Sequence, residues 1–245
     1  MIILYSGTPG SGKSLHAAER ICSFLSVGRP CICNFPVNPD RIKRYKGEFT
    51  YLPNEQLTPE VLIKYAQDYF ASRPRWSVKK KEGSIKLFID EAQLLYNSRD
   101  FKDRSRMAWL TFFSQHRHHG YDIYLMAQFD RMLDRQIRSL IEDEYMHRKV
   151  ANMGKIGWIV GHLTIRPLFF CRHLWYPMKE KLTGEFFVAH GKYYRLYDTH
   201  YIFNTGGSQD GRIEDGGRGA PPPKAVRPAL PRESMDKGDA GTSGC

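Results

Sequence analysis

The sequence lacks the cysteine pattern of a secreted, disulfide-linked protein. Its 245 residues hold five cysteines, an odd number without a regular framework, and this usage indicates reduced thiols in the cytosol. The pair Cys31-x-Cys33 is not C-x-x-C and has no second pair near it, so the spacing predicts no zinc site. The cysteines are Cys22, Cys31, Cys33, Cys171 and Cys245.

Long apolar runs are missing as well. A secretory signal needs an apolar core near the N-terminus, and residues 7–14 interrupt any such core with glycine and lysine. The most apolar region, residues 156–171, is broken by His162, Arg166 and Pro167. No run approaches the ~20 apolar residues of a membrane-spanning helix. We therefore expect a soluble chain.

Acidic residues are too few to balance the basic ones, and the formal net charge is +11. The segment after Asn204 holds six basic and six acidic residues, so the whole excess lies in residues 1–204. This excess indicates an anionic partner, such as a nucleotide, a nucleic acid or an anionic membrane surface, unless the protein is merely basic. Two basic segments could contact nucleic acid or lipid headgroups, or be ordinary solvated loops: Arg41 to Lys46, and Arg73 to Lys81 with Trp76 in its middle.

Strand-like and helix-like segments alternate over the first 142 residues. This alternation predicts an α/β fold with a mainly parallel sheet and helices on both faces. Hydrophobic residues make up 41% of the chain, which is enough for a large core. The expected strands are residues 1–6, 30–35, 85–91 and 122–128, and the expected helices are residues 15–25, 58–71, 107–118 and 130–140.

The pattern changes after Glu142. Turn residues separate apolar segments that resemble strands, and we expect an antiparallel, β-rich extension of the same domain over residues 143–204. From Thr205 the composition is mainly Gly, Pro, Ser, Asp and Arg, which predicts a disordered tail over residues 205–245. The expected strands of the extension are residues 144–150, 155–165, 168–175 and 186–197, with turns at 152–154, 166–167 and 183–184.

Residues 7–14 have the sequence Gly-Thr-Pro-Gly-Ser-Gly-Lys-Ser, which matches the phosphate-binding loop G-x-x-x-x-G-K-[ST] of NTPases. A strand precedes this motif and a helix follows it, as the chemistry requires. Glycines let backbone N–H groups point at phosphate oxygens, and the helix adds its positive end. Lys13 can reach the β and γ phosphates, and the Ser14 hydroxyl can bind Mg²⁺. The predicted nucleotide-binding residues are Gly7, Pro9, Gly10, Ser11, Gly12, Lys13, Ser14 and Leu15.

Polar side chains end two of the expected strands. Asp90 and Glu91 end an apolar strand. At this place the Asp90 carboxylate can hold Mg²⁺, and the Glu91 carboxylate can orient the attacking water. Gln128 ends the next strand and could touch the γ-phosphate or that water. Without a catalytic role, Asp90 and Glu91 would be a solvated acid pair, and Gln128 would be a plain polar residue at a strand end. The predicted metal ligands are Ser14 and Asp90.

An arginine could complete the site from a neighbouring subunit. Arg117, in a run of histidines, is our candidate for this role, while Arg131, Arg135 and Arg138 follow on the next expected helix. Any of the four could equally be surface charge. The histidines beside Arg117 do not have the H-E-x-x-H spacing, so they predict no metal site.

The combination of these motifs resembles the zonular occludens toxin-like family, which comprises the filamentous-phage gene I assembly and export proteins. The resemblance covers roughly residues 1–200. The phosphate loop and the acid pair are common to many NTPases, and their combination with the arginine-histidine run and a glutamine-ended strand is more specific. The residues that carry it are 7–14, Asn34-Phe35, Phe88 to Gln93, Ser114 to Gly120 and Ala127-Gln128.

The resemblance implies an ATPase in the host bacterial cytoplasm, at the cytoplasmic face of the inner membrane, that uses ATP and Mg²⁺ to drive phage extrusion. It also implies a homo-oligomer, expected to be a ring, and other phage assembly proteins as partners. Family members usually continue into a transmembrane helix, whereas this chain ends in a Gly/Pro-rich tail. A soluble fragment, or attachment through an inner-membrane partner, would explain this difference.

Two other functions fit the same motifs. The first is a nucleic-acid translocase, such as a packaging or transfer motor, which the basic loops permit. The second is a scaffold that binds ATP without hydrolysing it. A small-molecule kinase is disfavoured, because Glu91 and Gln128 have no obvious role in one.

Overall fold

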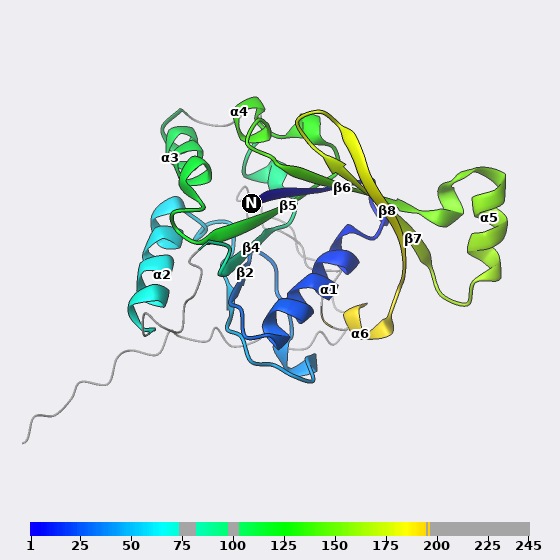
Figure 1. Ribbon diagram of the computed structural model, residues 1–245, viewed down its shortest axis with the longest axis horizontal. Coiled ribbons are helices and arrows are strands. Elements are labelled where there is room, and N and C mark those ends of the chain that lie inside the picture. The colour runs from blue at the N-terminus through cyan, green and yellow to red at the C-terminus, as the bar shows by residue number, and fades with distance from the viewer. Residues whose placement is uncertain (74–81, 98–102, 195, 197–245) are drawn as a thin grey trace, which may run out of the picture.

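The structure is a computed structural model that describes residues 1–73, 82–97, 103–194 and 196. An eight-stranded sheet runs through the protein in the order β3-β2-β4-β5-β1-β6-β7-β8 (Figure 1). Strands β1 to β6 are parallel, whereas β7 and β8 pair antiparallel at one edge. The strands are β1 (Ile2–Ser6), β2 (Cys31–Cys33), β3 (Phe49–Tyr51), β4 (Ile85–Ile89), β5 (Tyr121–Ala127), β6 (Asp143–Lys149), β7 (Leu168–Trp175) and β8 (Glu180–Val188).

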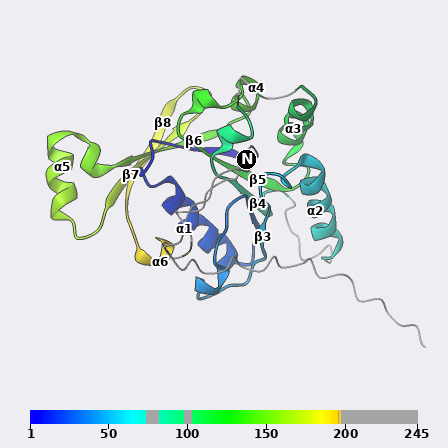
Figure 2. The ribbon, with the colours of Figure 1, turned by 180° about the vertical axis from the view of Figure 1, so that it is seen from behind.

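Helices cover both faces of the sheet (Figures 1 and 2). Along β1, Ile2 and Leu4 pack on the face that carries α2, α3 and α4, while Ile3 and Tyr5 pack on the face that carries α1 and α6. Burial on both faces explains why β1 is a nearly continuous apolar run. The helices are α1 (Lys13–Ser26), α2 (Pro59–Ala71), α3 (Asp103–Gln115), α4 (Arg135–Arg138), α5 (Gly154–Leu163) and α6 (Gly191–Tyr194), with 3₁₀ turns η1 (Pro39–Arg41), η3 (Ala92–Leu94), η4 (Asp130–Met132) and η5 (Val150–Asn152).

The predicted α/β class, with a mainly parallel sheet and an antiparallel C-terminal part, is confirmed. The first residues of α2 explain why the helix begins where it does. The Thr58 side chain accepts a hydrogen bond from the Val61 N–H at 3.4 Å, and Pro59 occupies the first turn. Across the described ranges, we find no helix with both the length and the apolar character to cross a bilayer.

The strand predicted over residues 155–165 is wrong, because these residues form most of helix α5. Strands β6 and β7 pair directly with each other, up to the Lys149–Phe169 pair. The residues between them therefore lie outside the ladder, and no described strand lies beside them to pair with. A helix satisfies its own backbone hydrogen bonds, so it is the stable form for an isolated projection.

Two other predicted boundaries are corrected. The helix expected over residues 130–140 is split into η4 and α4, because the Asp134 side chain accepts hydrogen bonds from the N–H groups of Gln136 and Ile137 and so starts a new helix. The turn expected at residues 183–184 lies inside β8, where Gly184 leaves room for the Phe170 ring. Strand β8 then ends at Val188, and the rest of the strand expected to residue 197 contains α6.

The expected extension is continuous with the core sheet. Its first strand, β6, runs parallel to β1 rather than forming an antiparallel hairpin with the core. Of the two basic segments, Arg41, Lys43, Arg44 and Lys46 are exposed around η1. The loop around Trp76 and the expected tail over residues 205–245 lie outside the described residues.

Candidate nucleotide-binding site

The glycine-rich loop connects β1 to α1 at the carboxyl edge of the parallel strands. Gly7, Gly10 and Gly12 have φ values of 143°, 71° and 98°, in the left-handed region that side chains disfavour. Gly12 is the N-cap of α1, and Lys13 is the first residue of this helix. Such a backbone, ending at a helix N-terminus, can present N–H groups to a phosphate.

The loop lies directly on strands β6 and β7. A Cβ atom on Gly7 would be 2.5 Å from the carbonyl oxygen of His147, and one on Gly12 would be 2.8 Å from the Phe169 ring. The Gly7 N–H also donates to the carbonyl oxygen of Gln128 at 3.2 Å. Two of the motif's glycines are therefore needed for packing as well as for backbone conformation, which the motif alone does not reveal.

Lys13 lies across this loop. Its Nζ donates hydrogen bonds to the carbonyl oxygens of Gly7 at 2.6 Å and Thr8 at 3.3 Å. Burial lowers the pKa of Lys13, and the negative charges of Asp90 and Glu91 oppose that shift. The two acids are therefore close enough to act electrostatically on the loop lysine, although β5 separates their strand from β1.

Asp90 follows β4 and is only 4% exposed. Asn34 clamps its backbone: the Asp90 N–H donates to Asn34 Oδ1 at 2.7 Å, and Asn34 Nδ2 donates to the Asp90 carbonyl at 2.9 Å. Asp90 Oδ1 accepts a hydrogen bond from the Glu91 N–H at 2.9 Å. Asn34 is a positioning residue to which we assigned no role from the sequence. Its place near the end of the strand expected over residues 30–35 was the available signal.

Glu91 has an unusual backbone for a non-glycine residue, with φ 46° and ψ 46°. Its Oε2 accepts a hydrogen bond from Gln93 Nε2, and Gln93 is itself buried. Backbone strain of this kind costs about 1–3 kcal/mol and persists where the surrounding structure enforces it. The carboxylate of Glu91 is thus held in one orientation beside the loop.

The other two predicted catalytic residues occupy opposite edges of the sheet. Gln128 directly follows β5 and is joined to Gly7 through its carbonyl oxygen, so it lies at the loop. Arg117 precedes β5, forms ion pairs with Glu82 at 3.4 Å and with Glu142, and lies at the amino edge. The structure does not bring Arg117 to the loop of its own chain. Arg131, in η4 after β5, is exposed.

The loop residues fit a nucleoside triphosphate and its metal ion. The Ser11 hydroxyl is buried and has no hydrogen-bond partner among the described residues, so a phosphate oxygen would satisfy it. A Cβ on Gly10 would meet nothing within 4 Å, which leaves room above the loop. Hydroxyl and carboxylate oxygens are the donors that Mg²⁺ prefers, and Ser14 and Asp90 could supply them.

The family model described as zonular occludens toxin (Zot) matches residues 1–165. The chain belongs to this family. Among curated proteins, one designated as an assembly protein, ORF301 of Pseudomonas phage Pf3, is 30% identical over 163 residues, which is 64% of this chain and 47% of that protein. The Zot-family chain therefore spans about half the length of the curated relative it matches.

Solved structures of the same architecture are also found. The N-terminal domain of zonular occludens toxin from Neisseria meningitidis has a TM-score of 0.50 at 19% identity, with 80% of this chain and 98% of that one covered. This likeness confirms the fold. The packaging NTPase B204 of Sulfolobus turreted icosahedral virus 2, in complex with AMP, has a TM-score of 0.45 at 14% identity, with 75% and 96% covered, which is too distant to indicate a shared function.

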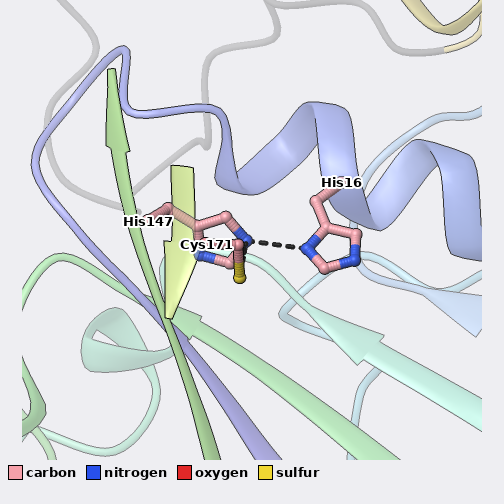
Figure 3. A group of neighbouring side chains, drawn as sticks. All are labelled: His16, His147 and Cys171. Carbon is pink, nitrogen blue, oxygen red and sulfur yellow. Dashed lines mark hydrogen bonds between the residues drawn. The ribbon is translucent and has the colours of Figure 1, made fainter. Parts of the chain in front are cut away.

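Next to the loop of this Zot-family chain, His16 and His147 form a buried pair (Figure 3). His16 Nδ1 and His147 Nε2 share a hydrogen bond of 2.8 Å, and His147 Nδ1 lies 3.3 Å from the Ser6 carbonyl. Cys171 Sγ is 3.7 Å from His147 Nε2. The three donor atoms lie within 4.8 Å of one another and are of types that zinc or copper accept. As arranged, however, the histidines bond to each other and join α1 to β6.

This pair should make stability depend on pH. Burial lowers the pKa of His16 to about 3, with the neighbouring His147 adding to the shift, and burial lowers the pKa of His147 to about 4. An unfolded histidine titrates near ~6.5, so below that pH the unfolded chain binds more protons than the folded one. The free energy of unfolding should fall by about 1–2 kcal/mol per histidine between pH 7.5 and pH 5.

Urea unfolding at several pH values measures this loss. His16→Gln removes one titrating group and should flatten the dependence between pH 6.5 and pH 5, whereas the exposed His118→Gln serves as the control. An identical slope in the parent and in His16→Gln would show that His16 is not held neutral.

Proposed function

We propose that this chain is an ATPase that powers the assembly and export of filamentous phage at the host inner membrane. The observation that carries the proposal is that Asp90 and Glu91 follow β4 at the same carboxyl edge of the parallel sheet as the loop that follows β1. A phosphate loop that shares its sheet edge with two acids is what ATP hydrolysis requires. The similarity to a phage Pf3 protein designated for assembly supports phage assembly as the process.

Each residue of the site has a proposed role. The loop from Gly7 to Leu15 binds the phosphates, with Lys13 on the β and γ groups. Mg²⁺, held by Ser14 and Asp90, neutralises charge on the phosphate oxygens when bound. Glu91 accepts a hydrogen bond from the attacking water and polarises it. Gln128, beside Gly7, donates to the γ-phosphate or to the same water.

The proposed working form is a homo-oligomeric ring at the cytoplasmic face of the membrane, with other phage assembly proteins as partners. An arginine from a neighbouring subunit would complete each site. Arg117 remains our sequence-based candidate, and its place at the amino edge means that it could act only in another subunit. Arg131, exposed in η4, is an alternative candidate for this role.

A nucleic-acid translocase is the second candidate function. The observation that favours it is the exposure of Arg41, Lys43, Arg44 and Lys46 on one connection, since such a cluster can bind phosphodiester backbones. The fixed carboxylate of Glu91 disfavours the third possibility, a scaffold that binds ATP without hydrolysing it.

Two measurements on the purified chain test the proposal. Hydrolysis of ATP should require Mg²⁺ and should not respond to added DNA, and molar mass from light scattering should rise when a non-hydrolysable ATP analogue is added. Stimulation by DNA would favour the translocase. If the oligomer of the parent chain binds ATP but does not hydrolyse it, the scaffold is favoured and the proposal is contradicted.

A further inference from the structure

Helix α5 stands apart from the body of the protein. In both ribbon views it lies at the end of β6 and β7, away from α1 to α4 (Figures 1 and 2). It packs on η5, where Gly157 lies against the carbonyl oxygen of Val150 and leaves no room for a Cβ. The projection is therefore a helix supported by its own connection and carried by two strands of the sheet.

The projection exposes large apolar side chains. Trp158 is 57% exposed, Ile159 51%, Leu163 78%, and Ile165, just beyond the helix, 102%. Four such residues fall within eight positions of this projection, and we call this cluster the α5 surface. Isolated apolar side chains are normal on a soluble protein, but a cluster on a projecting element indicates a binding partner.

The stretch of chain that contains the α5 surface carries charge of one sign only. Residues 145–179 contain no aspartate or glutamate. Arg148, Lys149, Lys155 and Arg166 are exposed there. None of these four cations forms an ion pair with a carboxylate within the described part of the chain. A partner should thus be both anionic and able to take up apolar side chains.

We propose that the α5 surface docks into the headgroup region of an anionic phospholipid leaflet. Trp158, Ile159, Leu163 and Ile165 would enter the boundary between headgroups and acyl chains, and the four cations would lie at the level of the lipid phosphates. This inference rests on the proposed work at the inner membrane and names a contact through which the chain reaches it.

Other partners fit the two features less well. A nucleic acid would pair with the cations but would leave Ile159, Leu163 and Ile165 in water. A second copy of the chain, joined through this surface by a two-fold axis, would bury the apolar side chains but bring like charges together. A bilayer surface satisfies both features at once.

The position of α5 also relates the membrane to the nucleotide. Strand β6 runs parallel to β1, so it enters the projection from the same sheet edge that carries the phosphate loop. The loop itself lies on His147 of β6 and Phe169 of β7. Docking through α5 would thus orient the nucleotide-binding edge toward the leaflet.

Binding to vesicles tests the proposal without nucleotide. The parent chain should co-sediment with vesicles of phosphatidylethanolamine and phosphatidylglycerol, and far less with vesicles of phosphatidylcholine alone. The double variant Ile159→Glu, Leu163→Glu should bind the anionic vesicles about tenfold more weakly, since binding scales with the apolar area buried. Met107→Glu is the matched control, because Met107 is 62% exposed on α3, at the other end of the molecule.

A second variant tests the cations. The triple change Arg148→Gln, Lys149→Gln, Lys155→Gln should weaken binding to anionic vesicles and reduce its salt dependence. Equal parent binding to both vesicle types, or none, would overturn the proposal. So would an α5 double variant that still binds vesicles but loses DNA binding or self-association. Vesicle binding and ATP hydrolysis are separate readouts, so loss of one alone identifies which of the two proposals is wrong.

Discussion

Glu91→Gln is expected to lower ATP hydrolysis by about 10²- to 10⁴-fold, which is the usual contribution of general base catalysis. The amide cannot accept a proton or polarise water as the carboxylate does. ATP affinity should be unchanged, because the phosphate contacts come from the loop. The fold should also be retained, since the new amide oxygen can still accept the hydrogen bond that Gln93 donates to Glu91.

Steady-state phosphate release and titration with a fluorescent ATP analogue measure the two quantities separately. Glu60→Gln, at an exposed position in the first turn of α2, is the matched control and should behave as the parent. Hydrolysis at the parent rate in Glu91→Gln would remove Glu91 from the mechanism and leave Gln128 as the residue to test.

Lys13→Ala is expected to weaken ATP binding by about 10- to 100-fold, because hydrogen bonds to charged groups are worth about 1.5–3 kcal/mol. The change also leaves the negative charges of Asp90 and Glu91 near the triphosphate without the cation between them. Thermal stability should change little, since the hydrogen bonds of the Lys13 ammonium to described residues go to two carbonyls of its own loop.

Isothermal titration with ATP and Mg²⁺ measures this loss. Lys64→Ala, which removes an exposed lysine from α2, is the control for the loss of one positive charge. Unchanged ATP affinity in Lys13→Ala would exclude Lys13 from the site. A large drop in melting temperature would instead show that the lysine is needed for the loop to fold.

Prediction from the sequence succeeded where the pattern reports local backbone chemistry. The glycines of residues 7–14 require left-handed φ values, and Gly7, Gly10 and Gly12 have them. Thr58 and Pro59 have the residue types preferred at the N-cap and first position of a helix, and α2 begins there. Prediction failed at residues 155–165, because the same apolar residues suit a strand or a helix, and the absence of a neighbouring strand decided between them.

The sequence predicted which residue types form the candidate site, but not the residues that position them. Asn34, which clamps the Asp90 backbone, and His147 and Phe169, on which the glycines lie, are distant in sequence from the groups they position. No local pattern links such residues. Arg117 was predicted from its neighbours in the sequence, and the chain's course from α3 into β5 places it at the opposite edge.

The α/β class, the phosphate-loop backbone and the strand that ends in two acids could all be predicted from local sequence. Each follows from interactions between residues close in the chain, or from the side-chain period of a strand or helix. The tertiary structure was needed to show that Asp90 and Glu91 share a sheet edge with the loop of Lys13, that Arg117 lies at the other edge, and that α5 projects with apolar side chains exposed. Those outcomes depend on the order and direction in which the strands pair, and pairing is set by burial and hydrogen bonding between segments far apart in the sequence.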